Sequence, residues 1–139
     1  MTEQAKAWLD RATEDLQALA LLEKNPDLNR VAAFHAQQGL EKALKAAVVL
    51  KGSPIPRSHD LVRLAAVADP LPGKLEDNLL IELTSLYTES RYPADVGLLP
   101  GGIPSSAAVQ RYHGALTQFI AEVGAAIARA GAAKERSHP

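Results

Sequence analysis

Residues 33–46 read AFHAQQGLEKALKA, and this stretch decides the fold class of the chain. The residues that follow at 47–50, AVVL, continue its apolar character. Together they place apolar side chains on nearly every side of a helix, which is typical of a helix buried on more than one side. We therefore predict a central or interface helix over 28–51, ended by the GSPIP sequence at 52–56.

Helix-breaking sequences separate this helix from four others. The breakers are Pro26, the sequence DPLPG at 69–73 and the Pro- and Gly-rich stretch at 91–104. Between them, helical spacing of apolar residues predicts helices at 2–24, 59–68, 74–90 and 105–130, the second of these capped by Ser58. No stretch alternates as a strand would. The predicted fold class is all-α.

The predicted architecture is an antiparallel helical bundle of four long helices plus one short helix. It occupies 1–131 as one domain, and 132–139 form a flexible tail. The central helix carries more apolar surface than one face of a bundle buries, and Leu98 and Leu99 add exposed apolar area. These features favour a homodimer.

Composition excludes several classes of function. The chain has no cysteine, which excludes disulfides, thiolate metal sites and cysteine nucleophiles. Histidine pairs with metal-binding spacing are also missing, so we expect neither a metal nor a cofactor. The N-terminus lacks the pattern of a signal peptide, and the longest apolar run, 46–50, cannot span a bilayer. We expect a cytoplasmic protein that does not enter a membrane.

Three blocks of sequence carry a family resemblance. The first is Trp8-Leu9 with Ala12 and Asp15-Leu16; the second is 33–46 followed by His59-Asp60-Leu61; the third is YTESRYP at 87–93. In order and spacing they resemble the HEPN family of small prokaryotic helical-bundle proteins, in the branch with an RYP signature. The resemblance implies a bundle, commonly dimeric, that is often encoded beside a minimal nucleotidyltransferase as a toxin–antitoxin pair. Some such relatives are metal-independent ribonucleases, and others bind nucleotides or act as non-catalytic partners.

The ribonuclease signature of that family is an arginine, four to six intervening residues, and a histidine. Arg91 is followed by no histidine before His113. Arg30 and His35 match the spacing but lie on the central helix, where their side chains point about 140° apart. We therefore predict no catalytic residues and weak or absent ribonuclease activity. The alternative is an endoribonuclease with an atypical site, in which Arg91 stabilises the phosphorane and His59 acts as base.

Polar residues from several elements form the candidate ligand-binding site. Gln38, Glu41 and Lys45 lie within about 60° of one another on the central helix, counting about 100° per residue. Glu41 and Lys45 are also spaced to form an i,i+4 ion pair. The full candidate set is Arg91, Tyr92, Lys45, Glu41, Gln38, His59 and Asp15.

Two of these candidates have alternative roles. The guanidinium of Arg91, at the end of the fourth helix, suits a phosphate, or it forms a structural clamp with Asp15 or Glu41. His59, at the predicted start of the short helix, is either neutral and hydrogen-bonded or faces a phosphate. For Asp15 we expect an ion pair with Arg91 or Lys45.

Charge is unevenly distributed along the chain. Residues 30–63 contain six basic and two acidic side chains, although the whole chain has a net charge of −1. This segment is either a solvated basic face or a footprint for RNA or a nucleotide. The leading prediction is a nucleotide- or RNA-binding partner protein, one half of a minimal-nucleotidyltransferase pair. A dimerising scaffold without ligand is the remaining alternative.

Overall fold

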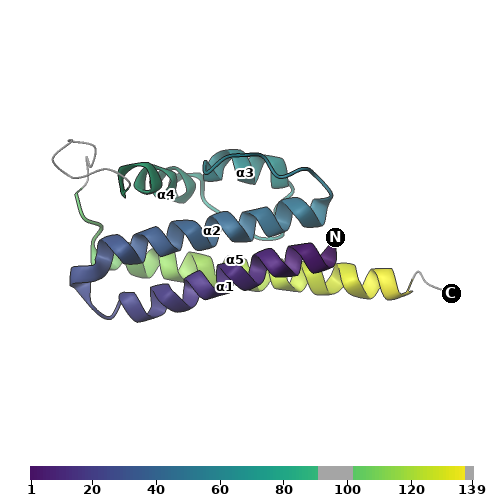
Figure 1. Ribbon diagram of the computed structural model, residues 1–139, viewed down its shortest axis with the longest axis horizontal. Coiled ribbons are helices and arrows are strands. Elements are labelled where there is room, and N and C mark those ends of the chain that lie inside the picture. Colours follow the sequence, from purple (N-terminus) through teal and green to yellow (C-terminus); the bar gives the residue numbers. More distant parts are fainter. Residues whose placement is uncertain (91–101, 137–139) are drawn as a thin grey trace.

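The computed structural model describes residues 1–90 and 102–136. Its elements are α1 (Thr2–Leu22), a short 3₁₀ turn η1 (Pro26–Leu28), α2 (Asn29–Lys51), α3 (Leu61–Ala68), α4 (Asp77–Ser90) and α5 (Ser106–Arg136) (Figure 1). The described residues form no strand, so the all-α prediction is confirmed. None of the described helices is long and apolar enough to cross a membrane.

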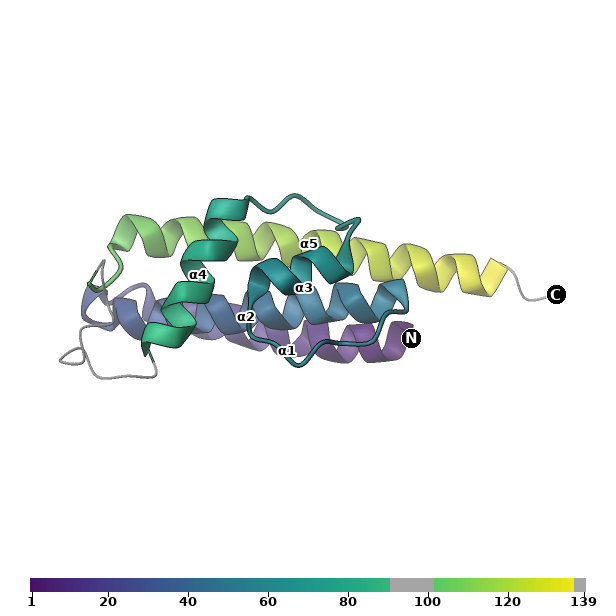
Figure 2. The same cartoon turned by 90° about the horizontal axis from the view of Figure 1, so that it is seen from above.

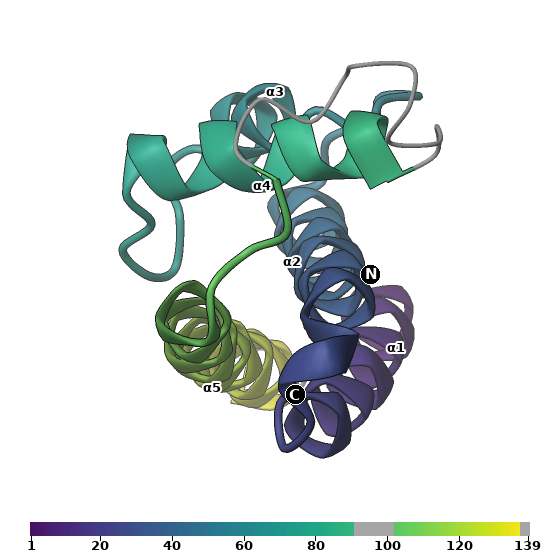
Figure 3. The same cartoon turned by 90° about the vertical axis from the view of Figure 1, so that its left-hand side faces the viewer.

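The helices form two layers around α2. α1 runs in the opposite direction to α2 and α5, and these three lie side by side along the long axis (Figure 2). α3 and α4 cover the other side of α2, with α4 lying across the axis of the bundle (Figure 3). The expected four long antiparallel helices therefore become three, of 21, 23 and 31 residues, plus a 14-residue α4 that crosses them.

The central position predicted for α2 is confirmed, because α1, α3, α4 and α5 all pack against it. Alanines at 32, 36 and 43 are buried, and their small side chains allow the neighbouring helices to come close. Apart from Val31, which is 43% exposed, the large apolar side chains of α2 are thus covered within one chain. The apolar surface of α2 no longer argues for a homodimer, which stays a prediction.

The ends of several helices differ from those expected. The carboxylate of Asp60, rather than Ser58, caps α3: it accepts hydrogen bonds from the N–H groups of Val62 (3.0 Å) and Arg63 (3.4 Å). His59 therefore precedes the helix instead of opening it. α5 continues to Arg136, so 132–136, expected in the tail, are helical.

Two connections hold the long helices in register. η1 turns the chain from α1 into α2, and the Asn25 side chain caps it by accepting a hydrogen bond from the N–H of Asp27 (3.1 Å). At the start of α2, the buried Asn29 amide donates to the Pro104 carbonyl oxygen (3.1 Å) and to the Ser106 hydroxyl (3.2 Å). The beginning of α5 is thereby fastened to the beginning of α2.

Candidate functional site

Glu41, in the middle of α2, organises one group of polar side chains although it is only 4% exposed. Its Oε2 accepts a hydrogen bond from Lys45 Nζ (2.9 Å), one helical turn further on. Its Oε1 lies 2.9 Å from Nδ1 of His59 and accepts a bond from the amide of Gln37 (3.3 Å), which in turn accepts from Gln38 (2.6 Å). We call these five residues the Glu41 cluster. A buried carboxylate is tolerated here because donors surround it.

Asp15 on α1 organises a second group, 7% exposed and facing α2. Its Oδ1 lies 2.9 Å from Nδ1 of His35, and its Oδ2 accepts a hydrogen bond from Lys42 Nζ (2.7 Å). We call these three residues the Asp15 cluster. Helical spacing of about 100° per residue places the two clusters on adjoining sides of α2. A single face of the hairpin formed by α1 and α2 therefore holds two lysines and two histidines on two buried carboxylates.

The carboxylates also fix the tautomers of the two imidazoles. A carboxylate can only accept, so Nδ1 of His35 and of His59 must carry a proton. In the neutral ring, Nε2 is then the basic nitrogen. The His35 side chain is 31% exposed and that of His59 is 53% exposed, so both rings reach the surface.

Trp8 on α1 joins this face through its two cationic neighbours. Lys45 Nζ lies 5.3 Å from the centroid of the indole ring, and the guanidinium of Arg11 lies 5.9 Å from it. Both distances fall within the range of cation–π attraction. Lys45 therefore contacts Glu41 and Trp8 at the same time.

The structure brings some of the predicted site residues together. Glu41, Lys45 and His59 are in direct contact, and Gln38 reaches Glu41 through Gln37. Of the two partners predicted for Asp15, only Lys45 lies within the described residues, and it binds Glu41 instead. Asp15 pairs with Lys42 and His35. Arg91 and Tyr92 lie outside the described residues.

Sequence reasoning missed His35 and Lys42 as members of the site. Their spacing of seven residues puts both on the side of α2 next to Gln38, which was a usable signal. The basic segment 30–63 is also less positive than its sequence suggests. Asp15 lies outside this segment, and its carboxylate neutralises the charge of Lys42. The side chains of Arg30, Arg57 and Arg63 are exposed.

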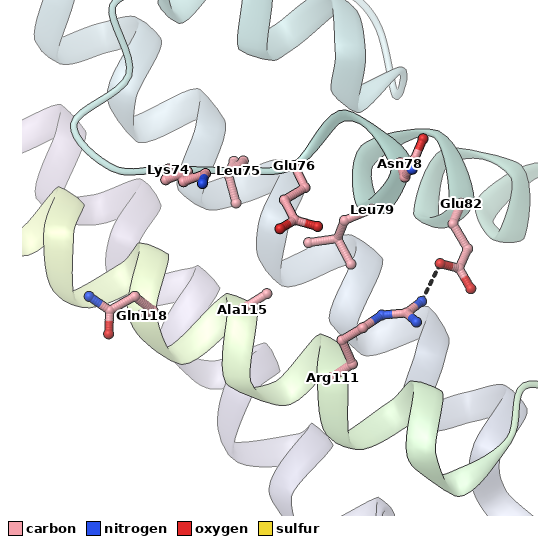
Figure 4. Close-up of a pocket in the computed structure, with 9 residues that line it drawn as sticks. All are labelled: Lys74, Leu75, Glu76, Asn78, Leu79, Glu82, Arg111, Ala115 and Gln118. Atoms are coloured by element: carbon pink, nitrogen blue, oxygen red, sulfur yellow. Dashed lines mark hydrogen bonds and ion pairs between the residues drawn. The ribbon is translucent and has the colours of Figure 1, made fainter.

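Away from the two clusters, a hollow of about 540 Å³ lies between α5, the beginning of α4 and the segment that leads into α4 (Figure 4). Arg111 extends across it to an ion pair with Glu82, and Glu82 also accepts a hydrogen bond from the buried hydroxyl of Tyr112 (2.7 Å). The other charged residues of its lining are Lys74 and Glu76. Basic and acidic groups balance, so this hollow has no electrostatic preference for an anion.

Within the described residues, no group of three or more His, Asp or Glu side chains is arranged to hold a metal ion.

Comparison with known families gives one match: the family model described as HEPN domain covers residues 5–121. Comparison with curated proteins and with solved structures gives no match to this chain. The matched range begins within the first turn of α1 and includes α2, α3, α4 and the first half of α5, together with every residue of the two clusters.

Proposed function

Because the chain belongs to the HEPN domain family, we propose that it binds a nucleotide or RNA through phosphate contacts on the α1–α2 face that carries the two clusters. HEPN domains point to nucleotide- or RNA-related functions. The observation that carries the proposal is the pair of buried carboxylates, Asp15 and Glu41, each holding one lysine and one histidine.

The charges of this face favour an anion. Arg11, Lys42 and Lys45 supply three cations against two carboxylates. Because the carboxylates already hold the cationic side chains in place, little side-chain entropy is lost when a phosphate binds. Lysine and arginine bind phosphate oxygens by charge-assisted hydrogen bonds.

The finer proposal concerns the partner. The RYP block at 87–93 supports a place beside a minimal nucleotidyltransferase, in a toxin–antitoxin or regulatory pair in the cytoplasm. In that role the chain is a non-catalytic binding protein, and Arg91 and Tyr92 remain proposed ligand contacts. Co-expression with such a nucleotidyltransferase, followed by size-exclusion chromatography, tests the pairing. Separate elution of the two proteins at micromolar concentration would contradict it.

RNA cleavage is the second candidate function, and one observation favours it. The His59–Glu41 contact of 2.9 Å holds the imidazole in the tautomer whose Nε2 is basic, as a general base requires. The test is cleavage of a labelled single-stranded RNA in the presence of EDTA. We expect little or no cleavage, whereas robust cleavage that His59→Ala abolishes would establish the ribonuclease.

Binding is tested by fluorescence anisotropy with a labelled 12-nucleotide single-stranded RNA and by calorimetry with ATP. We expect Lys42→Gln and Lys45→Gln each to weaken binding at least tenfold, and Lys45→Arg to retain most of it. The matched control is Lys6→Gln, which removes an exposed cation elsewhere on α1. A wild-type chain that binds neither RNA nor ATP at 1 mM ligand would overturn the proposal.

Stability must be measured on the same variants, because both lysines pair with buried carboxylates. A variant that lowers the melting temperature sharply is replaced by its arginine counterpart, which keeps the charge. Weakened binding in a folded Lys42→Gln protein, with full binding in Lys42→Arg, identifies the charge itself as the contact.

A further inference from the structure

The indole of Trp8 forms one wall of a cleft of about 370 Å³ beside the Glu41 cluster. The cleft is lined by Gln4, Ala7, Trp8, Arg11, Val49 and Ile55. Its walls are therefore mostly apolar, with one amide and one guanidinium as hydrogen-bond donors. A neighbouring recess of similar size shares Gln4, Val49 and Ile55 and extends the cleft toward Gly52.

We infer that this cleft is the base-binding subsite of the ligand: it takes the heterocyclic base of a nucleotide, and the phosphates extend toward Lys45 and Lys42. The inference rests on the proposed function, which it makes more specific. The proposed function requires only phosphate contacts on the α1–α2 face. The inference adds a contact with the base, made by Trp8, Gln4 and Arg11.

The composition of the cleft fits a flat, polar-edged ring. Aromatic faces and guanidinium planes both stack on nucleobases, and the lining of the cleft contains one of each, Trp8 and Arg11, which lie 5.9 Å apart from guanidinium to ring centroid. The amide of Gln4 can donate to or accept from the edge of a base. Small-molecule sites are typically apolar hollows with a few placed polar groups, from about 300 Å³ upward. At about 370 Å³, this cleft falls within that range.

Lys45 connects the cleft to the phosphate contacts. Its ammonium group lies 5.3 Å from the Trp8 ring and 2.9 Å from the Glu41 carboxylate. A ligand with an aromatic end at Trp8 and an anionic end beyond Lys45 would use both. A neutral aromatic compound would leave the cations unused, and a simple phosphate would leave the apolar walls unused.

Trp8 itself supplies the reporter for the test, because it is the chain's one tryptophan. We expect ATP to change its fluorescence emission saturably, at the same midpoint that calorimetry gives. Tripolyphosphate, which carries the anion without the base, should bind at least tenfold more weakly and leave the emission nearly unchanged. Arg11→Gln, at an exposed position, should weaken ATP binding about tenfold and tripolyphosphate binding by a smaller factor, because it removes a cation and also a plane on which the base stacks.

The matched control is Arg30→Gln, an exposed cation at the other end of α2, which should bind ATP as the wild type does. Trp8→Leu keeps an apolar side chain but removes the aromatic face, and it should weaken ATP binding, measured by calorimetry, at least tenfold. Should Trp8→Leu fail to fold, the affinity of Arg11→Gln for ATP and the Trp8 emission of the wild type still test the base subsite.

The outcomes separate the two claims. If ATP binds with Lys42- and Lys45-dependence but leaves Trp8 emission unchanged, and Arg11→Gln binds normally, the base subsite is overturned and the phosphate site stands. If neither ATP nor RNA binds, both are overturned. Equal affinity for ATP and tripolyphosphate would also overturn the base subsite, because the base would then contribute nothing.

Discussion

Gly39 on α2 lies so close to α5 that a Cβ atom placed on it would stand 2.7 Å from Cδ2 of Leu116. The same atom would lie 3.2 Å from Cβ of Asp15 and 3.5 Å from the carbonyl oxygen of Ala12, both on α1. The glycine thus lets α1 and α5 approach α2 at one level. This approach also sets the height at which Asp15 meets α2.

Replacing Gly39 with alanine should lower the free energy of unfolding by about 1–2 kcal/mol. Overpacking a core costs about 1–3 kcal/mol, and the better helix propensity of alanine offsets up to about 1 kcal/mol of that. Urea unfolding of wild type and variant measures the difference. The control is Gly114→Ala on α5, where no atom lies within 4 Å and a small stabilisation is expected. Equal effects at both positions would contradict the close approach.

Removing the Asp15 carboxylate should destabilise the fold more than any exposed charge does. Asp15→Ala leaves Lys42 and His35 without their shared acceptor, at a cost of roughly 3 kcal/mol. Removing one partner of a buried ion pair costs about 3–5 kcal/mol. We expect the lower end of that range because the side chains of Lys42 and His35 are 26% and 31% exposed and can turn toward water. Asp10→Ala, at an exposed position on the same helix, should stay within about 0.5 kcal/mol of wild type. Similar losses from both substitutions would show that Asp15 is not a buried anchor.

Tyr112 predicts a dependence of stability on alkaline pH. Burial, with a hydrogen bond to the Glu82 carboxylate, raises the pKa of the phenol well above its ordinary value. Because the pKa is higher in the folded state, its contribution to stability is complete below about pH 10 and falls as pH rises further. Tyr112→Phe should lose about 1 kcal/mol at neutral pH through the missing hydrogen bond. Above pH 10, the stabilities of wild type and Tyr112→Phe should converge; parallel curves from pH 9 to 11 would refute this.

The homodimer remains a prediction, now supported by a different surface. Large apolar side chains are exposed where α1 turns into α2 and where α5 begins: Leu21 is 70% exposed, Val31 43% and Ile103 58%. We expect light scattering to give twice the mass of the 14.8 kDa chain at tens of micromolar. Leu21→Glu should convert the dimer to a monomer without lowering the free energy of unfolding of the monomer. A monomeric wild type at 50 µM would contradict the prediction.

The sequence predicts those features that depend on the spacing of residues within a single helix. The buried state of α2 follows from its all-round apolar pattern, and the contact of Glu41 with Lys45 follows from their i,i+4 spacing. The partners of Asp15 do not follow in this way. Spacing gives the direction of a side chain around its own helix, but not the level at which two helices meet. That level depends on close packing at positions such as Gly39.

The direction of α4 relative to the bundle axis likewise could not be predicted from its apolar pattern. Its apolar positions predict a buried face, and Leu79, Leu80 and Leu83 are indeed buried. A buried face fits a helix along the bundle axis and a helix across it equally well. The direction of α4 depends on where the connection from α3 ends in space, and that position is set by the tertiary structure as a whole.

The hairpin of α1 and α2 has a consequence for the order in which the protein folds. A short connection joins the two helices, so closing it costs little chain entropy, and contacts between segments near in sequence form quickly. It also precedes the other helices in the chain and is therefore synthesised before them, which lets it fold first. Both carboxylate anchors and both lysines lie on this hairpin. The proposed ligand face is therefore assembled early, and α5, tied to Asn29, docks onto a surface that already exists.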